Sequence, residues 1–346
     1  MNIAVVSWAG CTRCIKESAM LAEAGHKLWF FNNFQPQISN KLDLTNIFVR
    51  LSSYNHPQQL YNITAGLDFF DLAHVHNEPS WMVDVLKQGG YKKIVFDAHD
   101  LGVVRNGWEN LNDGGREDLK AIGQANGLIV PCEKYIEILE ERGKMTIPWI
   151  VLYSYCSERD FVNAPTNDLG GIVYEGSIYA PSPNHPFPYR IYDNVAKHIV
   201  GANIPFYIYP SRGYERFMPY YHSLGCRIMP STDPGTLIQN LSRHKWGFVG
   251  SPVPHRQWHN TLSNKLFDYI AAGIPSFIYN AKATEDLFGN EGIGIVIKHL
   301  YEIEKYYNDD ILYKELQDNI MKVRSKWTME SQLPKLLDLY NKVLED

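Results

Sequence analysis

Short apolar runs alternate with helical segments from the start of the chain, and this alternation limits the fold more than any other feature. Residues 2–7 form an apolar run, residues 13–24 resemble a helix that ends at Gly25, and residues 26–31 form a second apolar run. This strand–loop–helix–strand order is typical of a βαβ unit, whose two strands are parallel. We expect the same architecture to continue, because further strand-like runs occur at residues 47–51, 72–76, 93–97, 127–130, 149–153, 172–177, 204–209, 226–230, 246–251 and 276–279.

The length of 346 residues predicts two domains of ordinary size. The best candidate for a linker is the polar segment 163–168, after which residues 172–177 begin a new strand. Residues 252–261 are polar and are expected to form a long loop. No internal repeat stands out.

The composition excludes several classes of protein. A hydrophobic content of 45% with 21% charged residues is that of a soluble globular protein. The net charge of −5 gives no basic footprint for nucleic acid. No apolar run reaches the roughly 18 residues of a membrane span. The first residues lack a basic region and a cleavage site, so we expect no signal peptide and a cytoplasmic protein.

The five cysteines are an odd number without a secretory signal, which favours reduced thiols. Cys11 and Cys14 have the spacing of a redox or metal motif. Zinc needs four ligands, however, and the chain has no second pair of this kind. The sequence offers no compact group of metal ligands, so we expect no metal site.

Residues 262–276 (LSNKLFDYIAAGIPS) combine a polar loop, one amphipathic helix and the start of a strand. Ser263 or Asn264 can cap the helix, because either side chain can accept a hydrogen bond from an N–H of the first turn. Gly273 is expected to end it. Lys265 stands in the first turn, where its charge opposes the helix dipole, so an anion is expected nearby.

This stretch resembles the nucleotide-binding motif of GT-B glycosyltransferases, chiefly the retaining group 4 type, whose common form is NK-L-F-E-Y-x-A-x-G-x-P. Asp268 stands where that family has Glu. In the family the helix start binds the donor diphosphate and the acidic residue holds the ribose hydroxyls. The resemblance therefore implies donor contacts from Asn264, Lys265 and Asp268. The alternative interpretation is an ordinary surface helix.

Two further segments resemble the same family. Residues 72–79 (LAHVHNEP) are similar to its vvHvHxEP element, and residues 93–101 (KIVFDAHDL) are similar to vvyDxHDl. Strand alternation places His74 and His76 on one face. Ligand crevices in parallel sheets lie at the carboxyl ends of strands, so the polar ends of these two strands predict one site.

His99 is the residue expected to act in catalysis, since in the family the matching position contacts the donor sugar near the reacting carbon. Asp97 and Asp100 flank it and are expected to orient it or to bind acceptor hydroxyls. The alternative is a histidine that only bonds the loop of a neighbouring strand. His76 is a weaker candidate.

Four other residues complete the expected site. Residues 8–12 resemble the first GT-B loop, at the floor of the cleft, where Gly10 and Arg13 are candidates. Arg13 has the alternative role of a solvated helix start. Gly176 would let the backbone approach a phosphate closely. Arg212 follows a strand and is a candidate diphosphate ligand, because arginine can bind phosphate through two hydrogen bonds.

One position departs from the family. Retaining members often carry a Glu eight positions before the acidic ribose ligand, and here that position is Asn260. An amide can hydrogen-bond a sugar hydroxyl but brings no charge. This departure leaves the sugar and the stereochemical course open.

The resemblance implies two Rossmann-like parallel-sheet domains that face each other across a cleft, at residues 1–165 and 166–326, with a closing helix at 327–346 packed on the first. It implies a metal-independent glycosyltransferase of glycan or polysaccharide biosynthesis, with a nucleotide-diphosphate sugar as donor and no cofactor. A glycan or lipid-linked glycan is the expected acceptor, and peripheral association with the inner face of the membrane stays open. The alternatives are a GT-B nucleotide-sugar epimerase, an inverting transferase, and a non-catalytic nucleotide- or glycan-binding subunit.

Overall fold

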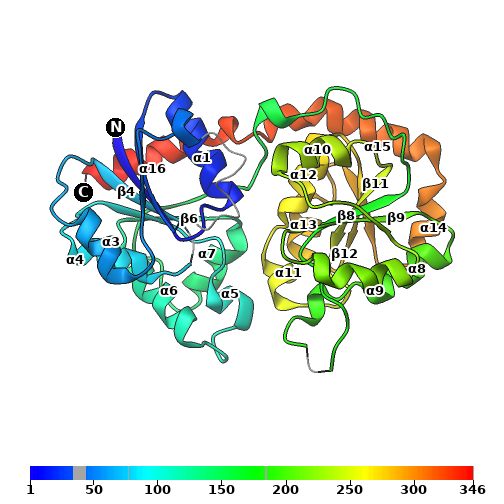
Figure 1. The fold of residues 1–346 in the computed structure, drawn as a ribbon, viewed down its shortest axis with the longest axis horizontal. Coiled ribbons are helices and arrows are strands. Elements are labelled where there is room, and N and C mark those ends of the chain that lie inside the picture. The colour runs from blue at the N-terminus through cyan, green and yellow to red at the C-terminus, as the bar shows by residue number, and fades with distance from the viewer. Residues whose placement is uncertain (34–43, 77, 184, 346) are drawn as a thin grey trace. The chain divides into compact units, whose positions relative to one another are not determined.

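The computed structural model describes residues 1–33, 44–76, 78–183 and 185–345 (Figure 1). Asn77 of the 72–79 motif lies outside them. The chain forms two compact units, one of Met1–Ser154 with Met329–Asp346, and the other of Tyr155–Thr328. The segment expected to be a linker, 163–168, lies within the second unit. There the N–H groups of Thr166 and Asn167 donate to the carbonyl of Ser242 at 3.1 and 3.2 Å.

The first unit is a parallel sheet in the order β3-β2-β1-β4-β5-β6-β7. Its strands are β1 (Asn2–Ser7), β2 (Lys27–Asn32), β3 (Arg50–Ser53), β4 (Leu72–His76), β5 (Ile94–Asp97), β6 (Gly127–Val130) and β7 (Trp149–Val151). Its helices are α1 (Thr12–Glu23), α3 (Pro57–Thr64), α4 (Trp81–Gln88), α5 (Gly102–Asn106), α6 (Asp113–Gln124), α7 (Glu133–Glu140) and α16 (Leu333–Glu345). The strand order reverses between β1 and β4, and such a switch point is where open α/β sheets bind ligands.

The C-terminal helix α16 is part of the first unit, as expected. Leu336, Leu339 and Val343 are fully buried or nearly so, in the same apolar cluster as Ile3 of β1. The hydroxyl of Tyr340 lies 2.7 Å from Nδ1 of His74 on β4. Helix α16 therefore closes one face of the sheet, while α4 and α6 lie on the other (Figure 1).

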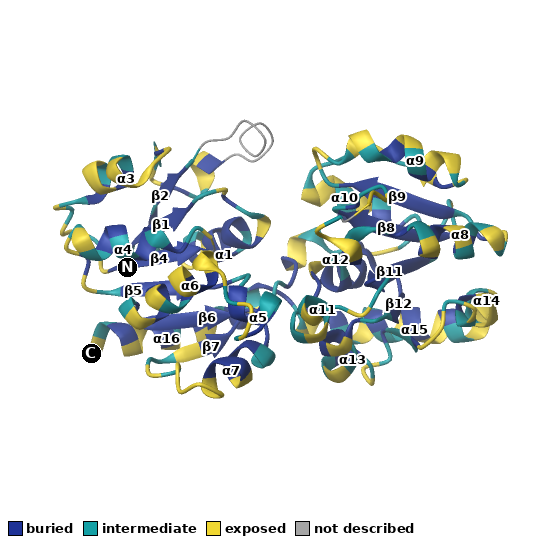
Figure 2. Ribbon diagram, turned by 90° about the horizontal axis from the view of Figure 1, so that it is seen from below, coloured by how far each residue is buried: buried dark blue, intermediate teal, exposed yellow. Residues whose placement is uncertain are grey.

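The second unit is a parallel sheet in the order β10-β9-β8-β11-β12-β13. Its strands are β8 (Ile172–Gly176), β9 (Phe206–Pro210), β10 (Arg227–Ile228), β11 (Trp246–Gly250), β12 (Ser276–Tyr279) and β13 (Gly294–Ile297). Its helices are α8 (Asp193–Gly201), α9 (Met218–Ser223), α10 (Pro234–Leu241), α11 (Arg256–Asn260), α12 (Asn264–Ala272), α13 (Lys282–Phe288), α14 (Glu302–Tyr307) and α15 (Asp310–Val323). Figure 2 shows the strands of both sheets mainly buried and the helices exposed on their outer faces.

Three local expectations were wrong. The strand expected at 47–51 begins only at Arg50. The loop expected at 252–261 contains the short helix α11, because the ring of His255 accepts a hydrogen bond from the N–H of Gln257 at 3.2 Å and caps it. Ser263 stands at the N-cap of α12, but its side chain makes no capping hydrogen bond.

The end of α12 follows the expectation. Gly273 has the left-handed conformation, with φ of 76°, and the helix stops there. A Cβ at this position would lie 2.6 Å from Cγ of Pro165, so both backbone and space require glycine. The helix therefore leads directly into β12.

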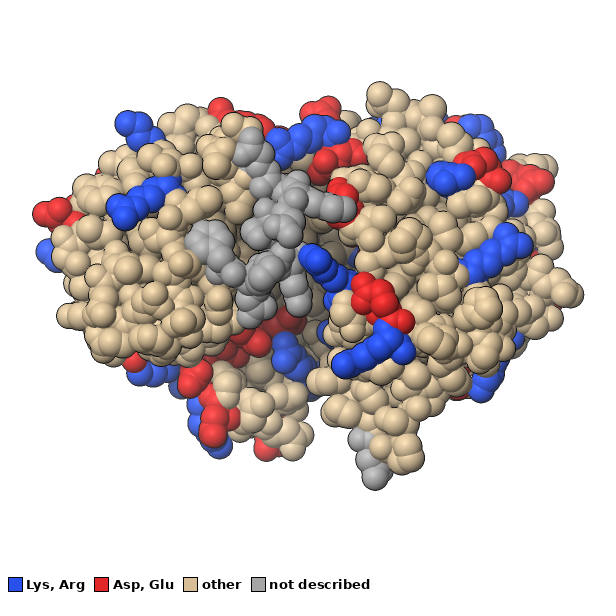
Figure 3. Space-filling view, viewed as in Figure 1, with Lys and Arg blue, Asp and Glu red and all other residues tan. Residues whose placement is uncertain are grey.

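The distribution of charged side chains on the surface is consistent with the net charge of −5. On the face drawn in Figure 3, acidic and basic side chains are interspersed over each unit. In the part of the chain that the structure describes, no helix combines the length and the apolar character needed to cross a membrane.

Two glycine-to-alanine substitutions, one of them a control, test the packing of α16. In Gly127→Ala, the new methyl group would lie 2.8 Å from Val343 and 3.3 Å from Leu339. We expect unfolding in urea to show a loss of about 1–3 kcal/mol, the scale of overpacking. Gly123→Ala on α6 is the control, since nothing lies within 4 Å of the added atom, and it should stabilise slightly. Equal effects of the two changes would contradict this packing.

Candidate functional site

A buried polar network in the first unit is centred on Asp97. His76 and Asp97 are register partners at the carboxyl ends of β4 and β5. The Asp97 carboxylate is fully buried and accepts two hydrogen bonds from Arg13, from Nε at 2.9 Å and from Nη2 at 3.1 Å. Oδ2 of Asp97 also lies 3.0 Å from Nε2 of His99 and 3.3 Å from Nδ1 of His76. The polar ends of the two strands therefore lie together, as their order in the sequence predicted; that they form a ligand site stays a prediction.

Arg13 is the main cation of this network. Its guanidinium donates to the carbonyl of Leu152 and to Oγ of Ser154 in addition to Asp97. Arg13 is buried, so the alternative interpretation, a solvated helix start, was wrong. Burial alone would lower the pKa of Arg13, but Asp97 and Glu17 raise it above its ordinary value. Burial alone would raise the pKa of Asp97, but Arg13 and His99 hold it well below its usual range.

His99 is held between Asp97 and the first loop. Its Nδ1 lies 3.5 Å from Sγ of Cys11, and its carbonyl accepts a hydrogen bond from the hydroxyl of Tyr135 at 2.8 Å. Burial would lower the pKa of His99, but Asp97 and Cys11 together raise it to about 10. The ring is therefore an imidazolium at neutral pH, which donates hydrogen bonds and does not act as a base. Its side chain is 12% exposed. Asp100, also expected here, is half-exposed and ion-paired with Arg105 at 3.6 Å.

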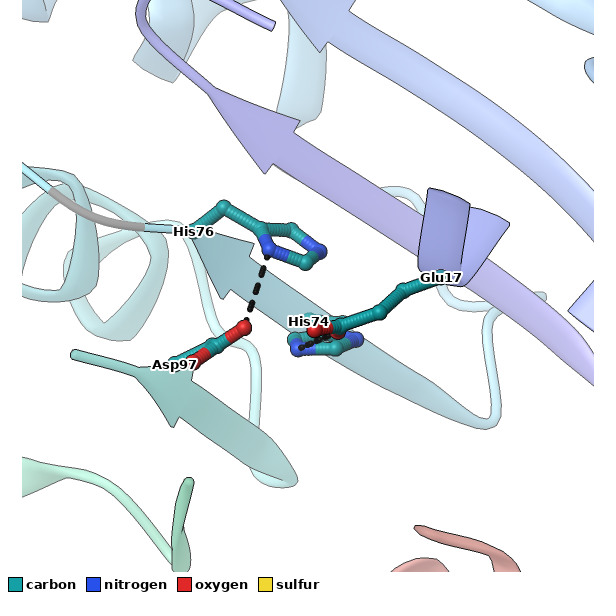
Figure 4. Close-up of side chains that lie close together, drawn as sticks. All are labelled: Glu17, His74, His76 and Asp97. Carbon is teal, nitrogen blue, oxygen red and sulfur yellow. Dashed lines mark ion pairs between the residues drawn. The ribbon is translucent and has the colours of Figure 1, made fainter. Parts of the chain in front are cut away.

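Four members of the network are of types that bind metals: Glu17, His74, His76 and Asp97 (Figure 4). Their ligand atoms lie within 4.8 Å of one another, and all four residues are buried. The sequence could not show this group, because the residues come from α1, β4 and β5. Burial raises the pKa of Glu17, and burial lowers that of His74, so both favour their neutral forms.

The group fits a metal ion poorly, because Arg13 already supplies the positive charge. Its Nε lies 2.9 Å from a carboxylate oxygen of Glu17 and 2.9 Å from one of Asp97. A divalent ion among these carboxylates would stand beside the guanidinium in a buried site, and like charges there repel strongly. The ring of His74 is also fixed from its other side by Tyr340.

Gly10 lies beside this network but has its own constraint. Its φ is +52°, and an added Cβ would lie 3.0 Å from Nδ2 of Asn32 and 3.2 Å from Cζ of Phe30. Its N–H donates to Oγ of Ser7 at 3.1 Å. Turn geometry and packing thus explain this glycine, and its N–H is already engaged.

In the second unit, Gly176 and Lys265 lie together. Gly176 ends β8 with φ of 119°, and an added Cβ would lie 2.9 Å from Nζ of Lys265. The ammonium group lies 5.3 Å from the ring centre of Tyr174 and 5.8 Å from that of Trp258. The half-buried lysine is thus positioned over the carboxyl end of a central strand, at the first turn of α12.

The other predicted donor ligands flank this pair. Asn264 is the exposed first residue of α12, and Asp268 is half-buried one turn later, with Oδ1 3.1 Å from Sγ of Cys156. Arg212 is exposed just beyond β9, whose Pro210 is the register partner of Gly176. Asn260 ends α11, and its amide donates to the carbonyl of Arg256 at 3.0 Å.

A cavity of about 550 Å³ lies at the carboxyl ends of β9 and β10. Its lining is mainly apolar and comprises Pro210, Glu215, Met218, Pro219, His222, Ile228, Met229, Pro230 and Ser231. The strand expected near 226–230 contributes to this lining, but the sequence did not predict the contribution of α9.

The sequence also did not predict that Glu17, Tyr340 and Trp258 would lie beside the candidate residues. The spacing of Cys11 and Cys14 was the one feature that indicated a special role for the thiol beside His99.

Removing Arg13 tests the network. Arg13→Met leaves the buried Asp97 carboxylate without its main cation, and we expect a loss of about 3–5 kcal/mol in the free energy of unfolding at pH 7. Asp97 stabilises the wild type above its unfolded pKa of about 3.9, whereas the orphaned Asp97 carboxylate destabilises the variant there, so the deficit should shrink as the pH falls from 7 towards 4.

Arg116→Met, which breaks an exposed ion pair with Asp113, is the control and should change stability little. Denaturant unfolding at several pH values measures both variants. A deficit for Arg13→Met that is small or independent of pH would contradict the buried network.

Comparison with known proteins finds no matching family model and no match among curated proteins. Among solved structures, the chain is similar to a sucrose-phosphate synthase from Thermosynechococcus elongatus, at 14% identity and a TM-score of 0.69, covering 100% of this chain and 99% of the other. The chain is also similar to Anabaena HepE in complex with UDP and glucose, at 11% identity and a TM-score of 0.72; the match covers 98% of this chain and 99% of the other. A third similar structure is an alpha-glucosyltransferase in complex with UDP-glucose and DNA, at 10% identity and a TM-score of 0.67; the match covers 99% of each chain. These neighbours are glycosyltransferases of GT-B type, and the chain has the GT-B fold.

Proposed function

We propose that this chain is a glycosyltransferase that moves a sugar from a nucleoside-diphosphate donor to an acceptor hydroxyl. One observation carries the proposal: the ammonium group of Lys265 lies against the backbone of Gly176, at the first turn of α12 and the carboxyl end of β8. A lysine, a close-approach glycine and a helix N-terminus together suit a diphosphate. The GT-B fold of the neighbours supports the same conclusion.

The donor contacts follow from this position. Lys265 and the N–H groups of the first turn of α12 bind the diphosphate, and Arg212 adds a second cation from the neighbouring strand end. Asp268 accepts hydrogen bonds from the ribose hydroxyls, since a carboxylate offers several acceptor positions. The half-buried position of Asp268 strengthens these bonds.

The cavity beside β9 and β10 is suited to the base. Its walls of methionine, isoleucine and proline offer an apolar surface, while Glu215 and Ser231 offer polar groups for the edge of a ring. Two neighbours are described in complex with UDP or UDP-glucose. We therefore take UDP as the first nucleotide to test.

Chemistry requires positive charge where the bond to the diphosphate breaks, because negative charge grows on the leaving oxygen. In the second unit, Lys265 and the helix N-terminus supply it, so no divalent metal and no cofactor are required. In the first unit, the His99 imidazolium is a fixed positive charge that stabilises negative charge on the departing phosphate. Asp97 keeps it charged and oriented.

We extend the proposal to retention of anomeric configuration and to glycan or polysaccharide synthesis, with a glycan or lipid-linked glycan as acceptor at the inner face of a membrane. The motif around Asp268 favours retention. Asn260 supports the second candidate function, a non-catalytic nucleotide- or glycan-binding subunit, because a neutral amide stands where retaining enzymes often have a carboxylate. Turnover of a donor by the purified chain separates the two.

Lys265→Met tests donor binding. Loss of a charged hydrogen-bond donor costs about 1.5–3 kcal/mol, so the Kd for UDP should rise by about 10- to 150-fold in calorimetry. Lys282→Met is the matched control, since Lys282 also stands in the first turn of a helix of this unit but is 52% exposed and paired with Asp286. The Kd of Lys282→Met for UDP should equal that of the wild type. The assignment fails if both variants bind UDP equally well.

His99→Ala tests the catalytic role. We expect turnover of the donor to fall by about 10²- to 10³-fold, as for loss of one transition-state donor, while the Kd for UDP stays unchanged. His99→Gln keeps a side-chain amide within reach of Asp97 and controls for folding. The measurements are turnover, Kd and melting temperature on one preparation. Turnover within a few-fold of the wild type, or a free-donor epimer as the product, would refute the proposal.

A further inference from the structure

The pair Cys11 and Cys14 is left unexplained by glycosyl transfer. Cys11 is the N-cap residue of α1 and is half-buried, whereas Cys14 is fully buried within the first turn. In the sequence the pair carries little weight, because the chain has no second pair of this kind. The structure adds two partners that the sequence could not place.

Cys11, His99 and Asp97 form a connected triad. Sγ of Cys11 lies 3.5 Å from Nδ1 of His99, and Nε2 of the same ring lies 3.0 Å from Oδ2 of Asp97. Asp97 is fixed in turn by two hydrogen bonds from Arg13. A thiol, an adjacent imidazolium and a carboxylate that orients the ring are the three elements of a thiol activated by a lowered pKa.

The charges around the sulfur favour the thiolate. Burial would raise the pKa of the Cys11 thiol, but the His99 imidazolium and the N–H of Cys14 lower it below its ordinary value, with Asp97 opposing them. Burial raises the pKa of Cys132 to about 11 and that of Cys226 to about 12. Cys11 is thus distinguished from these two thiols by its partners and by its access to solvent.

We propose that Cys11 is a reactive thiolate that hydroperoxides oxidise to a sulfenic acid. The Cys11 sulfur attacks the terminal peroxide oxygen, an S–O bond forms and the O–O bond breaks. Sulfur loses two electrons, which leave with the alkoxide or hydroxide. That leaving group takes the proton from Nδ1 of His99, giving an alcohol or water and a neutral imidazole.

Oxidation changes the charge of the network. The sulfenic acid is neutral, so it no longer pairs with a positive His99, and the imidazole is left with Asp97 alone. The site is defined by residues of the first unit and does not depend on glycosyl transfer. Its test therefore needs no activity assay.

The first experiment measures the rate at which each cysteine of the folded, full-length chain reacts with iodoacetamide, by mass spectrometry, between pH 5 and 9. An ordinary thiol, with a pKa of about 8.5, loses reactivity about tenfold for each pH unit below this value. We expect Cys11 to react faster than the other four cysteines and to keep most of its rate at pH 6.5. A rate midpoint at or above about 8.5 would overturn the proposal.

Two variants and one oxidant complete the test. His99→Gln removes the imidazolium, and the Cys11 rate at pH 6.5 should fall at least about tenfold, towards that of an ordinary thiol. Cys14→Ser keeps the backbone N–H and should change the rate by no more than a few-fold. After one equivalent of hydrogen peroxide, dimedone should label Cys11. Absence of the adduct at Cys11 in the wild type, or an unchanged rate in folded His99→Gln, would refute the triad.

Discussion

The buried ion pair between Arg13 and Asp97 is the interaction on which the first unit depends. It joins the start of α1 to the end of β5, and further hydrogen bonds from the guanidinium reach Leu152 and Ser154 after β7. Three loops at the carboxyl edge of the sheet are thereby tied to one cation. A buried charge that loses its partner is costly, so these loops are held in place by electrostatics as well as by packing.

The same ion pair sets the chemistry of its neighbours. Because Arg13 keeps Asp97 ionised, the carboxylate in turn keeps His99 protonated, and His99 favours the thiolate of Cys11. Negative and positive groups therefore alternate from the guanidinium to the sulfur. One arrangement supplies a fixed positive charge for the proposed sugar transfer and an activated thiol for the proposed oxidation.

The second unit offers a complementary set of groups. Lys265, Gly176 and the first turn of α12 lie at the carboxyl end of a parallel sheet, as the His99 network does in the first unit. In open parallel sheets this edge is where ligands bind. The proposed function assigns diphosphate binding to the second unit and the charged ring to the first.

Much of the fold could be predicted from the sequence, because alternation of apolar runs and helices requires parallel sheets. The proximity of Asp97 and His99 also followed, since both stand at one strand end. The burial of Arg13 could not be predicted, because its partners lie far along the chain. The helix α11 was missed for a local reason, since a histidine caps it and cap patterns favour Ser, Thr, Asp and Asn.

The most direct measurement of the central claim is a crystal structure of this chain with UDP. We predict that the diphosphate lies against the first turn of α12, within hydrogen-bond distance of Lys265 and beside the backbone of Gly176, with the ribose at Asp268. UDP bound only to the first unit, or a diphosphate away from α12, would contradict the account.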